Sequence, residues 1–277
     1  MGAFLASELT FHSRKGRLKG EAASRERAVW TITLNRPDKL NSFSSEMHAD
    51  LKQAMQIIQT EHSVRVLMIT GAGRGFCAGQ DLSERMMGDN ETADVGSSLE
   101  KNYNPLLKQL RALPYPVIGA VNGVAAGAGC NLALACDIVI AARSASFIQI
   151  FSRIGLIPDA GGTYTLPRLV GTARAMAAAM LAEKVSAEQA EQWGMIWKCV
   201  DDAQFMHEAK ALARQLAGQA TRALGLTKRA IYASANNTFE QQLDLERDLQ
   251  REAAKSEDFR EGVTAFKEKR PAEFTGR

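Results

Sequence analysis

Two short, largely apolar segments each run directly into a glycine-rich turn. They are VRVLMIT (64–70), followed by GAGRGFCAGQDL, and VIGAV (117–121), followed by NGVAAGAGCNLALAC. An almost unbroken apolar strand indicates a strand that is covered on both faces, as in parallel sheets. A third unit of the same kind joins the strand predicted at 28–34 to the helix predicted at 45–60. These repeated units predict α/β layering around mostly buried strands.

The rest of the chain divides into an α/β part and a helical part. Further predicted elements are a strand at 8–18, an exposed hairpin loop at 16–27, a helix at 97–112, and strands at 137–142 and 145–148. From about residue 160 the pattern is helical, and Ser186 followed by Gln189 resembles a capping box. We therefore expect a core at 1–200 and a helical region at 201–277 that is not an independent folding unit.

Composition narrows the functional classes. The chain has 277 residues, 45% of them hydrophobic, and a formal net charge of +3, so it can bury a large core. So small an excess of positive charge argues against nucleic acid or an anionic membrane as a partner. The apolar runs end short of the ~20 residues that a membrane span needs. With no recognisable signal peptide at the N-terminus, we expect a cytoplasmic protein.

Cysteine usage points the same way. The four cysteines are Cys77, Cys130, Cys136 and Cys199. None forms a C-x-x-C pair, and no histidine cluster accompanies them, so a metal site is not expected. Free buried thiols suit a reducing compartment.

Each glycine-rich turn has two interpretations. The turn at 73–82 could direct backbone N–H groups at a ligand oxygen, or could be an ordinary turn after a strand. The run at 122–137 could expose the N–H groups of a helix start from Ala128, or could serve tight helix-on-sheet packing. Together the two turns could supply one N–H each to a single oxygen. The four histidines are His12, His48, His62 and His207. We expect them on surfaces away from these turns, which argues against a histidine-driven catalytic triad.

Asp159 is a candidate acid/base residue. It follows a proline in the largely apolar segment 151–171 and precedes Gly161 and Gly162. It could cap the helix that starts near Gly161. Alternatively, its carboxylate could lie in an apolar loop that raises its pKa and makes it a better proton carrier. Position alone does not choose between the two.

The ordered set of motifs resembles the crotonase (enoyl-CoA hydratase/isomerase) superfamily over about residues 27–277. The segments that carry the resemblance are NRPDKLNSF, GRGFCAGQDL, NGVAAGAGCNLALACD, GLIPDAGGT and EGVTAFKEKRPAEF. The resemblance implies a crotonase-like spiral of ββα units with a C-terminal helical trimerisation region. It also implies a homotrimer or a dimer of trimers, and an acyl-CoA substrate. No separate cofactor is implied, because coenzyme A is part of the substrate.

The resemblance also assigns roles to individual residues. The N–H groups of Ala78 and Ala128 would form an oxyanion hole for the thioester carbonyl. Residues implied in binding coenzyme A are Lys39, Gln80, Asp81 and Leu82, with Phe266 and Lys269 reaching it from the C-terminal helix, in some members from a neighbouring subunit.

Departures from the family pattern sharpen the predicted chemistry. Asn131 and Phe151 occupy the places of the two glutamates that activate water in hydratases, and neither can act as a general base. Asp159 matches the carboxylate that dienoyl-CoA isomerases use for proton transfer. The resemblance therefore implies a CoA-thioester isomerase, closest to the ring-epoxide isomerases of aerobic phenylacetate degradation.

Four alternatives remain open. The chain could be an enoyl-CoA hydratase or a Δ3,Δ2-enoyl-CoA isomerase of fatty acid metabolism. It could be a dehalogenase in which Asp159 is the nucleophile, or a non-catalytic acyl-CoA-binding subunit. A complex with a related enoyl-CoA hydratase is a possible partner arrangement.

Overall fold

Two β-sheets form the centre of the protein in the computed structural model, which describes residues 4–5, 9–13, 28–85 and 94–277. The larger sheet has the order β1-β2-β3-β4-β6-β8-β11 and the smaller one β10-β9-β7-β5. Strands of the larger sheet are β1 Phe4–Leu5, β2 Leu9–Ser13, β3 Val29–Leu34, β4 Val66–Gly71, β6 Val117–Val121, β8 Ile138–Ala142 and β11 Lys198–Val200. Strands of the smaller sheet are β5 Gly75–Cys77, β7 Val124–Ala126, β9 Ser146–Ile148 and β10 Lys184–Ser186.

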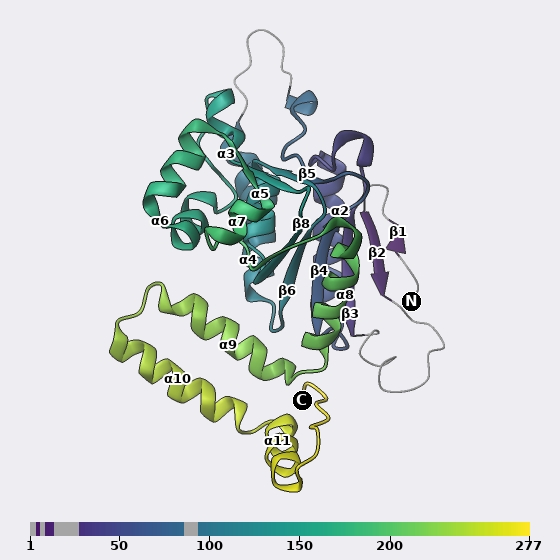
Figure 1. Ribbon diagram of the computed structural model, residues 1–277, viewed down its shortest axis with the longest axis vertical. Helices are drawn as coiled ribbons and strands as arrows, with labels where there is room; N and C mark the ends of the chain where they lie inside the picture. The colour runs from purple at the N-terminus through teal and green to yellow at the C-terminus, as the bar shows by residue number, and fades with distance from the viewer. Residues whose placement is uncertain (1–3, 6–8, 14–27, 86–93) are drawn as a thin grey trace.

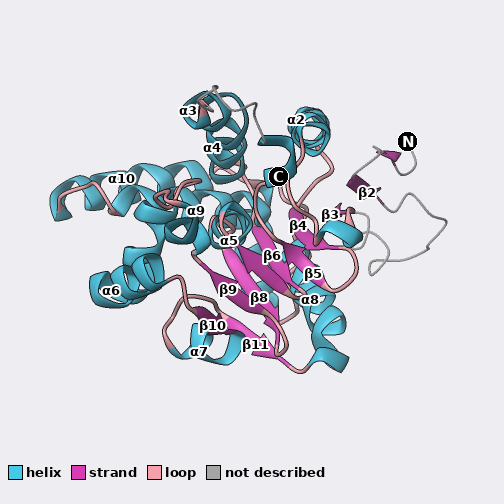
Figure 2. Ribbon diagram, turned by 90° about the horizontal axis from the view of Figure 1, so that it is seen from above, coloured by secondary structure: helices cyan, strands magenta, loops and turns pink. Residues whose placement is uncertain are grey.

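Helices cover both sides of the larger sheet. The longer helices are α2 Ser45–Thr60, α4 Asn104–Ala112, α6 Gly162–Leu181, α8 Asp202–Ala217, α9 Thr221–Ser234, α10 Phe239–Ala253 and α11 Glu257–Glu268. Short ones are η1 Pro37–Lys39, η2 Leu82–Arg85, α3 Val95–Ser98, the π-turn η3 Leu99–Tyr103, α5 Ala128–Leu134, η4 Ile150–Ile154 and α7 Ala187–Gln192. Figure 2 shows α8 on one side of the sheet, with α2 and α4 on the other.

The path of the chain between the two sheets sets the position of the site. Each of β4, β6 and β8 in the larger sheet is followed within a few residues by β5, β7 and β9 in the smaller one, and then by helix. This repeat confirms the predicted crotonase-like spiral of ββα units. Because β5, β7 and β9 are parallel neighbours, their carboxyl ends lie side by side. The segments that follow Cys77, Ala126 and Ile148 therefore meet at one edge.

Close backbone approach brings helix α5 onto strand β5. A Cβ atom at Gly129 would lie 2.7 Å from the Cβ and Sγ atoms of Cys77, and it would also overlap the Cys77 carbonyl oxygen. A Cβ at Gly79 would lie 2.9 Å from the Ala126 carbonyl oxygen and 3.5 Å from the Ala128 nitrogen. The two glycine-rich turns are thus in direct contact, and the small residues of the 122–137 run serve tight helix-on-sheet packing, as one of its two interpretations predicted.

Most predicted elements are confirmed, with physical reasons for the exceptions. Helix 45–60 and strand 117–121 have the predicted bounds, and Ser186 Oγ accepts the Gln189 N–H as the capping pattern predicted. The helix predicted at 97–112 is interrupted by the π-turn. Strands β1, β5, β7, β10 and β11 were not predicted, because segments of two or three residues are too short to show an alternating pattern. Of the predicted strand 8–18, residues 9–13 are described, and the 16–27 loop lies outside the described residues.

The C-terminal helices differ in their relation to the core. Helix α8 buries Phe205, Ala209 and Ala213 in the main hydrophobic cluster, whereas α9, α10 and α11 extend away from it (Figure 1). Among the contacts that anchor this extension is an ion pair of 2.8 Å between Lys228 and Asp137. The division at residue 200 stays a prediction. No described helix is both long and apolar enough to span a membrane.

Gly129→Ala tests the contact between α5 and β5. The added methyl group would overlap Cys77, so the helix or the strand must move, and we expect a loss of about 3 kcal/mol in the free energy of unfolding. Urea denaturation measures it. Gly262→Ala in α11 is the control, because its Cβ would meet the nearest atom at an ordinary 3.5 Å. Equal stability of the two variants would contradict the tight approach.

Candidate active site

The first segment of the site follows β5, and its hydrogen bonds change one prediction. The Ala78 N–H donates to the Leu40 carbonyl oxygen at 2.9 Å. It is therefore engaged inside the protein, and the prediction that Ala78 supplies an oxyanion-hole donor is wrong for this structure. The sequence could not reveal this, because N–H directions alternate along an extended chain and depend on the neighbouring strand.

Gln80 is the residue of this segment whose backbone amide faces away from Phe43. Phe43 donates to the Gly79 carbonyl at 2.7 Å and accepts from the Asp81 N–H at 2.9 Å, so Phe43 and Gln80 form a parallel bridge. In such a bridge the flanking residues carry the ladder bonds, and the N–H of Gln80 itself points to the opposite side. Its side chain is held as well: Nε2 donates to the Phe43 carbonyl at 3.1 Å, and Tyr103 Oη donates to Oε1 at 2.7 Å.

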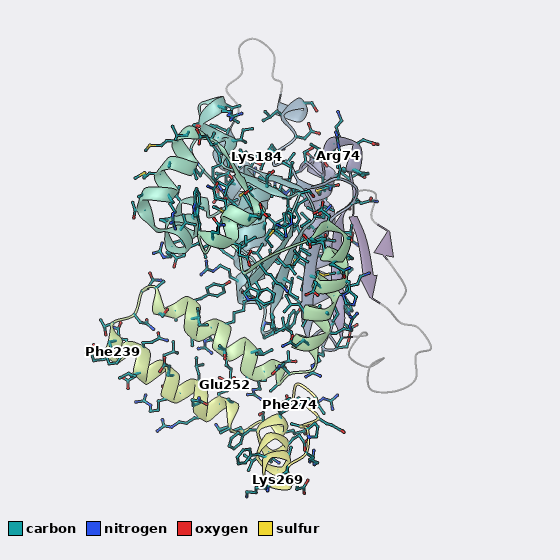
Figure 3. All side chains as sticks on the ribbon, in the orientation of Figure 1. Arg74, Lys184, Phe239, Glu252, Lys269 and Phe274 are labelled. Atoms are coloured by element: carbon teal, nitrogen blue, oxygen red, sulfur yellow. The ribbon has the colours of Figure 1, made fainter. Side chains whose placement is uncertain are left out.

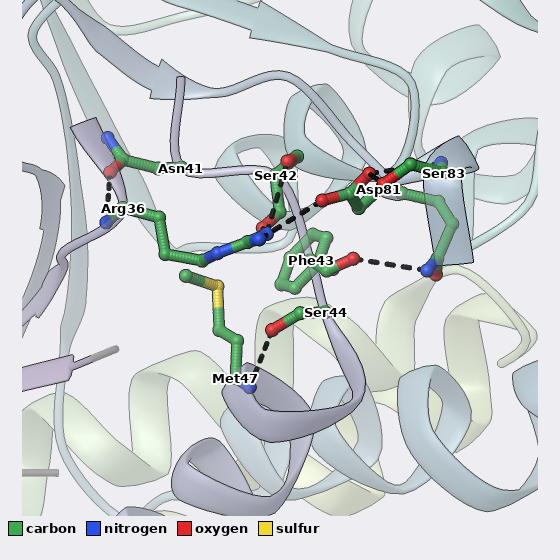
Figure 4. A network of polar contacts seen from close by, with 9 residues as sticks. Arg36, Asn41, Ser42, Phe43, Ser44, Met47, Asp81 and Ser83 are labelled. Atoms are coloured by element: carbon green, nitrogen blue, oxygen red, sulfur yellow. Dashed lines mark hydrogen bonds and ion pairs between the residues drawn. The ribbon is translucent and has the colours of Figure 1, made fainter. Parts of the chain in front are cut away.

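Asp81 has a structural role that its predicted contact with coenzyme A did not include. Its carboxylate accepts from Ser83 Oγ at 2.6 Å and from the Ser83 N–H at 3.1 Å, and it pairs with Arg36 at 3.1 Å (Figure 4). The Ser83 hydroxyl, the Ser83 backbone N–H and the Arg36 guanidinium hold the pKa of Asp81 below its usual value. Arg36 also donates to the Ser42 carbonyl at 2.7 Å, so the pair joins the loop after β3 to the loop after β5.

The second segment follows β7. Gly127 has φ of +52°, a conformation that favours glycine, and its N–H donates to the Ile148 carbonyl at 2.9 Å. Ala128 begins α5, where the N–H has no intrahelical partner, and among the described residues none accepts from it. A Cβ at Gly127 would lie 3.7 Å from the Phe151 ring. Phe151 is buried and covers this turn.

The third segment follows β9 and carries Asp159. This residue is half-buried, and its Oδ1 atom is shielded from solvent. Helix α6 begins at Gly162 with Gly161 as its N-cap residue, so Asp159 is not the side-chain cap. Instead its backbone carbonyl accepts the Gly162 N–H at 2.8 Å. Ala160 and Gly161 both have positive φ, +48° and +76°, which turns the chain sharply after Asp159.

Asn131 connects the second and third segments. It is 2% exposed, and its Nδ2 donates to the Asp159 carbonyl oxygen at 2.8 Å. Its Oδ1 accepts from Gln149 Nε2 at 2.7 Å. Gln149 was not singled out from the sequence; its only signal there is a polar residue directly after the apolar strand β9.

Nucleophilic side chains other than Asp159 are poorly suited to catalysis here. Burial raises the pKa of the Cys77 and Cys130 thiols to about 12, so both stay protonated at neutral pH. His48 is buried against Phe43 and Tyr103, with ring centroids 5.2 and 4.6 Å away. Its predicted surface position is wrong, because aromatic residues from two other segments cover it. His62 and His207 are exposed, as predicted.

The remaining predicted contacts with coenzyme A lie in two places. Lys39 and Leu82 are both exposed. Leu82 belongs to the first segment, and Lys39 precedes Leu40, whose Cδ2 atom would lie 3.1 Å from a Cβ at Gly75 in β5. Phe266 is 86% exposed on α11. Lys269 ends that helix at the opposite end of the molecule from Arg74, which directly precedes β5 (Figure 3). Within one chain, α11, which carries Phe266 and ends at Lys269, lies at the far end of the molecule from β5 (Figure 1). Within the described residues no cluster of three or more potential metal ligands occurs.

Comparison with known proteins fits this geometry. Residues 24–277 match the family model described as enoyl-CoA hydratase/isomerase. The chain belongs to this family.

Individual relatives differ in their named reactions. The 1,2-epoxyphenylacetyl-CoA isomerase of Escherichia coli (strain K12) is 56% identical over 253 residues, which cover 91% of this chain and 97% of that protein. The 2,3-dehydroadipyl-CoA hydratase of the same organism is 36% identical over 254 residues, covering 92% and 98%. The crystal structure of an enoyl-CoA hydratase from Bacillus anthracis superposes with a TM-score of 0.85 at 34% identity, covering 90% of this chain and 96% of that chain.

Asp81→Asn tests the ion pair between Asp81 and Arg36, which joins the loop after β5 to the loop after β3. Removing the ionised acceptor breaks this ion pair, so we expect a loss of about 1–3 kcal/mol in stability at pH 7. Because the folded pKa is lowered, this stabilisation is present above the unfolded value of about 3.9 and is lost as the pH falls through the folded pKa. Urea unfolding from pH 7 toward about pH 2 should show the difference between the proteins disappear. Asp244→Asn, in an exposed pair with Arg247, should change little at any pH.

Proposed function

We propose that this protein is an isomerase that converts 1,2-epoxyphenylacetyl-CoA to oxepin-CoA in aerobic phenylacetate degradation. The observation that carries the proposal is the 56% identity to an enzyme of that name, over 91% of this chain. The site is compatible with it, because the Asp159 carbonyl accepts a hydrogen bond from Asn131 of α5, the helix that begins with Ala128. Asn131 and Phe151 leave no carboxylate at the two positions where hydratases of the family carry glutamates.

In the proposed mechanism, the thioester carbonyl oxygen accepts hydrogen bonds from the Ala128 N–H and a second backbone amide. We assign the second donor to Gln80, since Ala78 donates to Leu40 and the amide of Gln80 points away from Phe43. Asp159 removes a proton from the carbon next to the carbonyl, and the two amides stabilise the resulting enolate. Loss of one such donor typically costs about 10²–10³-fold in rate.

The second half of the reaction returns the same proton. The enolate electrons move into the ring as the carbon–carbon bond of the epoxide opens to the seven-membered oxepin. Asp159 then delivers its proton to a more remote carbon, so substrate and product are isomers and no oxidant is needed. Phe151 supports this route, because its buried ring covers Gly127 and keeps water from the enolate. One carboxylate can perform both transfers.

Hydration is the second candidate function, because relatives of 34–36% identity are named as hydratases. With Asn131 and Phe151 present, we expect water addition to crotonyl-CoA to be slow. Rapid hydration would favour this alternative over the isomerase. Binding of CoA esters without turnover of any aryl or enoyl substrate would favour a non-catalytic subunit, and a trapped aryl-enzyme adduct a dehalogenase.

We further propose that the protein works as a homotrimer or a dimer of trimers in the cytoplasm. Large apolar side chains are exposed on α6 and on the extended helices, as expected of surfaces that contact other subunits. They include Met176, Met180, Leu181, Ile231, Phe239 and Phe266. The free cysteines fit a reducing compartment. A complex with a related enoyl-CoA hydratase stays a prediction.

Asp159→Asn tests the assignment of the base. The variant keeps nearly the same shape, so we expect isomerisation to fall by about 10²–10⁴-fold while the Kd for a CoA ester stays within a few-fold. Analysis of the product in samples quenched at set times measures the isomerisation rate, and calorimetry measures the Kd. Asp202→Asn, at the first residue of α8, is the control. Normal turnover by Asp159→Asn would show that the assignment is wrong.

Phe266→Ala tests whether α11 serves a neighbouring subunit. We expect a higher KM for the acyl-CoA, since an apolar contact with coenzyme A is lost, and little change in kcat. Mixed oligomers of Phe266→Ala and Asp159→Asn chains should recover sites of normal KM, because one chain supplies Asp159 and its neighbour supplies Phe266. No recovery on mixing would indicate that Phe266 acts within its own chain or not at all.

A further inference from the structure

We infer that Asn131 and Gln149 form a buried relay that fixes the position of Asp159, so that Asn131 is a positioning residue. The inference rests on the proposed role of Asp159 as the base. The relay has two steps: Gln149 Nε2 donates to Asn131 Oδ1 at 2.7 Å, and Asn131 Nδ2 donates to the Asp159 carbonyl oxygen at 2.8 Å. Gln149 and Asn131 are 3% and 2% exposed. The asparagine therefore supplies a donor that the glutamate of a hydratase, when ionised, lacks.

The direction of the relay is fixed by its last acceptor. A backbone carbonyl can only accept, so Asn131 must turn Nδ2 toward Asp159 and Oδ1 toward Gln149. Gln149 must then turn Nε2 toward Asn131. Its Oε1 is left buried without a hydrogen-bond partner among the described residues. A buried acceptor of this kind is unfavourable, and it is the consequence of orienting the amide for the relay.

Neighbouring backbone restricts the relay from the other side. A Cβ atom at Gly162 would lie 2.8 Å from Cγ and from Oδ1 of Asn131. The Gly162 N–H donates to the same Asp159 carbonyl, which is therefore held by two donors. The left-handed residues Ala160 and Gly161 follow at once, so the carbonyl has little freedom to rotate.

The relay also gives the base and the oxyanion donor a common reference. Asn131 and Ala128 are both residues of α5, three positions apart, and α5 is buried along its whole length. A shift of the Asp159 loop relative to the enolate oxygen would thus require the Asn131 contact to break. Since a misplacement of about 1 Å can cost about 10²-fold in rate, this contact should affect proton transfer more than binding.

The test uses proton exchange at the α-carbon of phenylacetyl-CoA in D₂O, followed by NMR. This measurement reports proton removal without the later ring chemistry, and calorimetry gives the Kd of the same ligand. Asn131→Asp is nearly isosteric but replaces the donor with an acceptor. We expect exchange to slow by about 10–100-fold, with the Kd within about 3-fold of wild type. Gln149→Glu, one step further from Asp159, should slow exchange less.

Two additional variants make the result decisive. The double variant Asn131→Asp/Gln149→Glu should slow exchange by less than the product of the two single effects, because both changes break the same relay. Gly162→Ala displaces the Asn131 amide by sterics alone and decides the question if Asn131→Asp does not fold. Ser186→Ala, which removes the cap of α7, is the control for general destabilisation and should exchange at the wild-type rate.

The outcomes separate the relay from the proposed function. If Asp159→Asn exchanges protons like the wild type, the proposed base is wrong. If Asp159→Asn loses exchange while Asn131→Asp and Gly162→Ala keep the wild-type rate, the base stands and the relay is overturned. Slow exchange with unchanged Kd in the Asn131 and Gly162 variants supports the relay.

Discussion

The contact between helix α5 and strand β5 is the constraint on which the site depends. At Gly129 the helix lies so close to Cys77 that no side chain fits between them. The approach carries the Ala128 N–H toward the segment after β5, which contains the Gln80 amide that we propose as the second donor. Without it the two turns could not address one oxygen. An added side chain at Gly129 would cost much stability, because a backbone carbonyl cannot move aside as a flexible side chain can.

Around this contact, buried polar groups hold each segment in place. Asp81 and Arg36 join the first segment to the loop after β3, and Asn131 joins the second segment to the third. These hydrogen bonds are internal to the protein, so in the proposed mechanism the groups left to meet substrate are mainly backbone amides and a single carboxylate. A scaffold of this type orients the reacting groups before substrate arrives, which is the main source of electrostatic catalysis.

The sequence predicted the framework well because its signals are local. The apolar face of α2, formed by Met47, Leu51, Met55 and Ile58, defines that helix without help from tertiary structure. The donor at the first turn could not be predicted, because whether Ala78 or Gln80 points at a ligand depends on how residues 40–43 pair with it. Likewise, His48 is buried by Phe43 and by Tyr103, which is distant in sequence. Such pairings carry no periodic pattern.

The fit among Asn131, Gln149 and Gly162 has an evolutionary consequence. A glutamate at position 131 would need space that Gly162 borders, and although it could still accept from Gln149, it would leave the carbonyl of Asp159 without its present donor. A lineage that exchanged water addition for proton shuttling, or the reverse, would therefore have to change several neighbouring residues together. Such coupling would keep the two chemistries on separate branches even where the folds superpose closely.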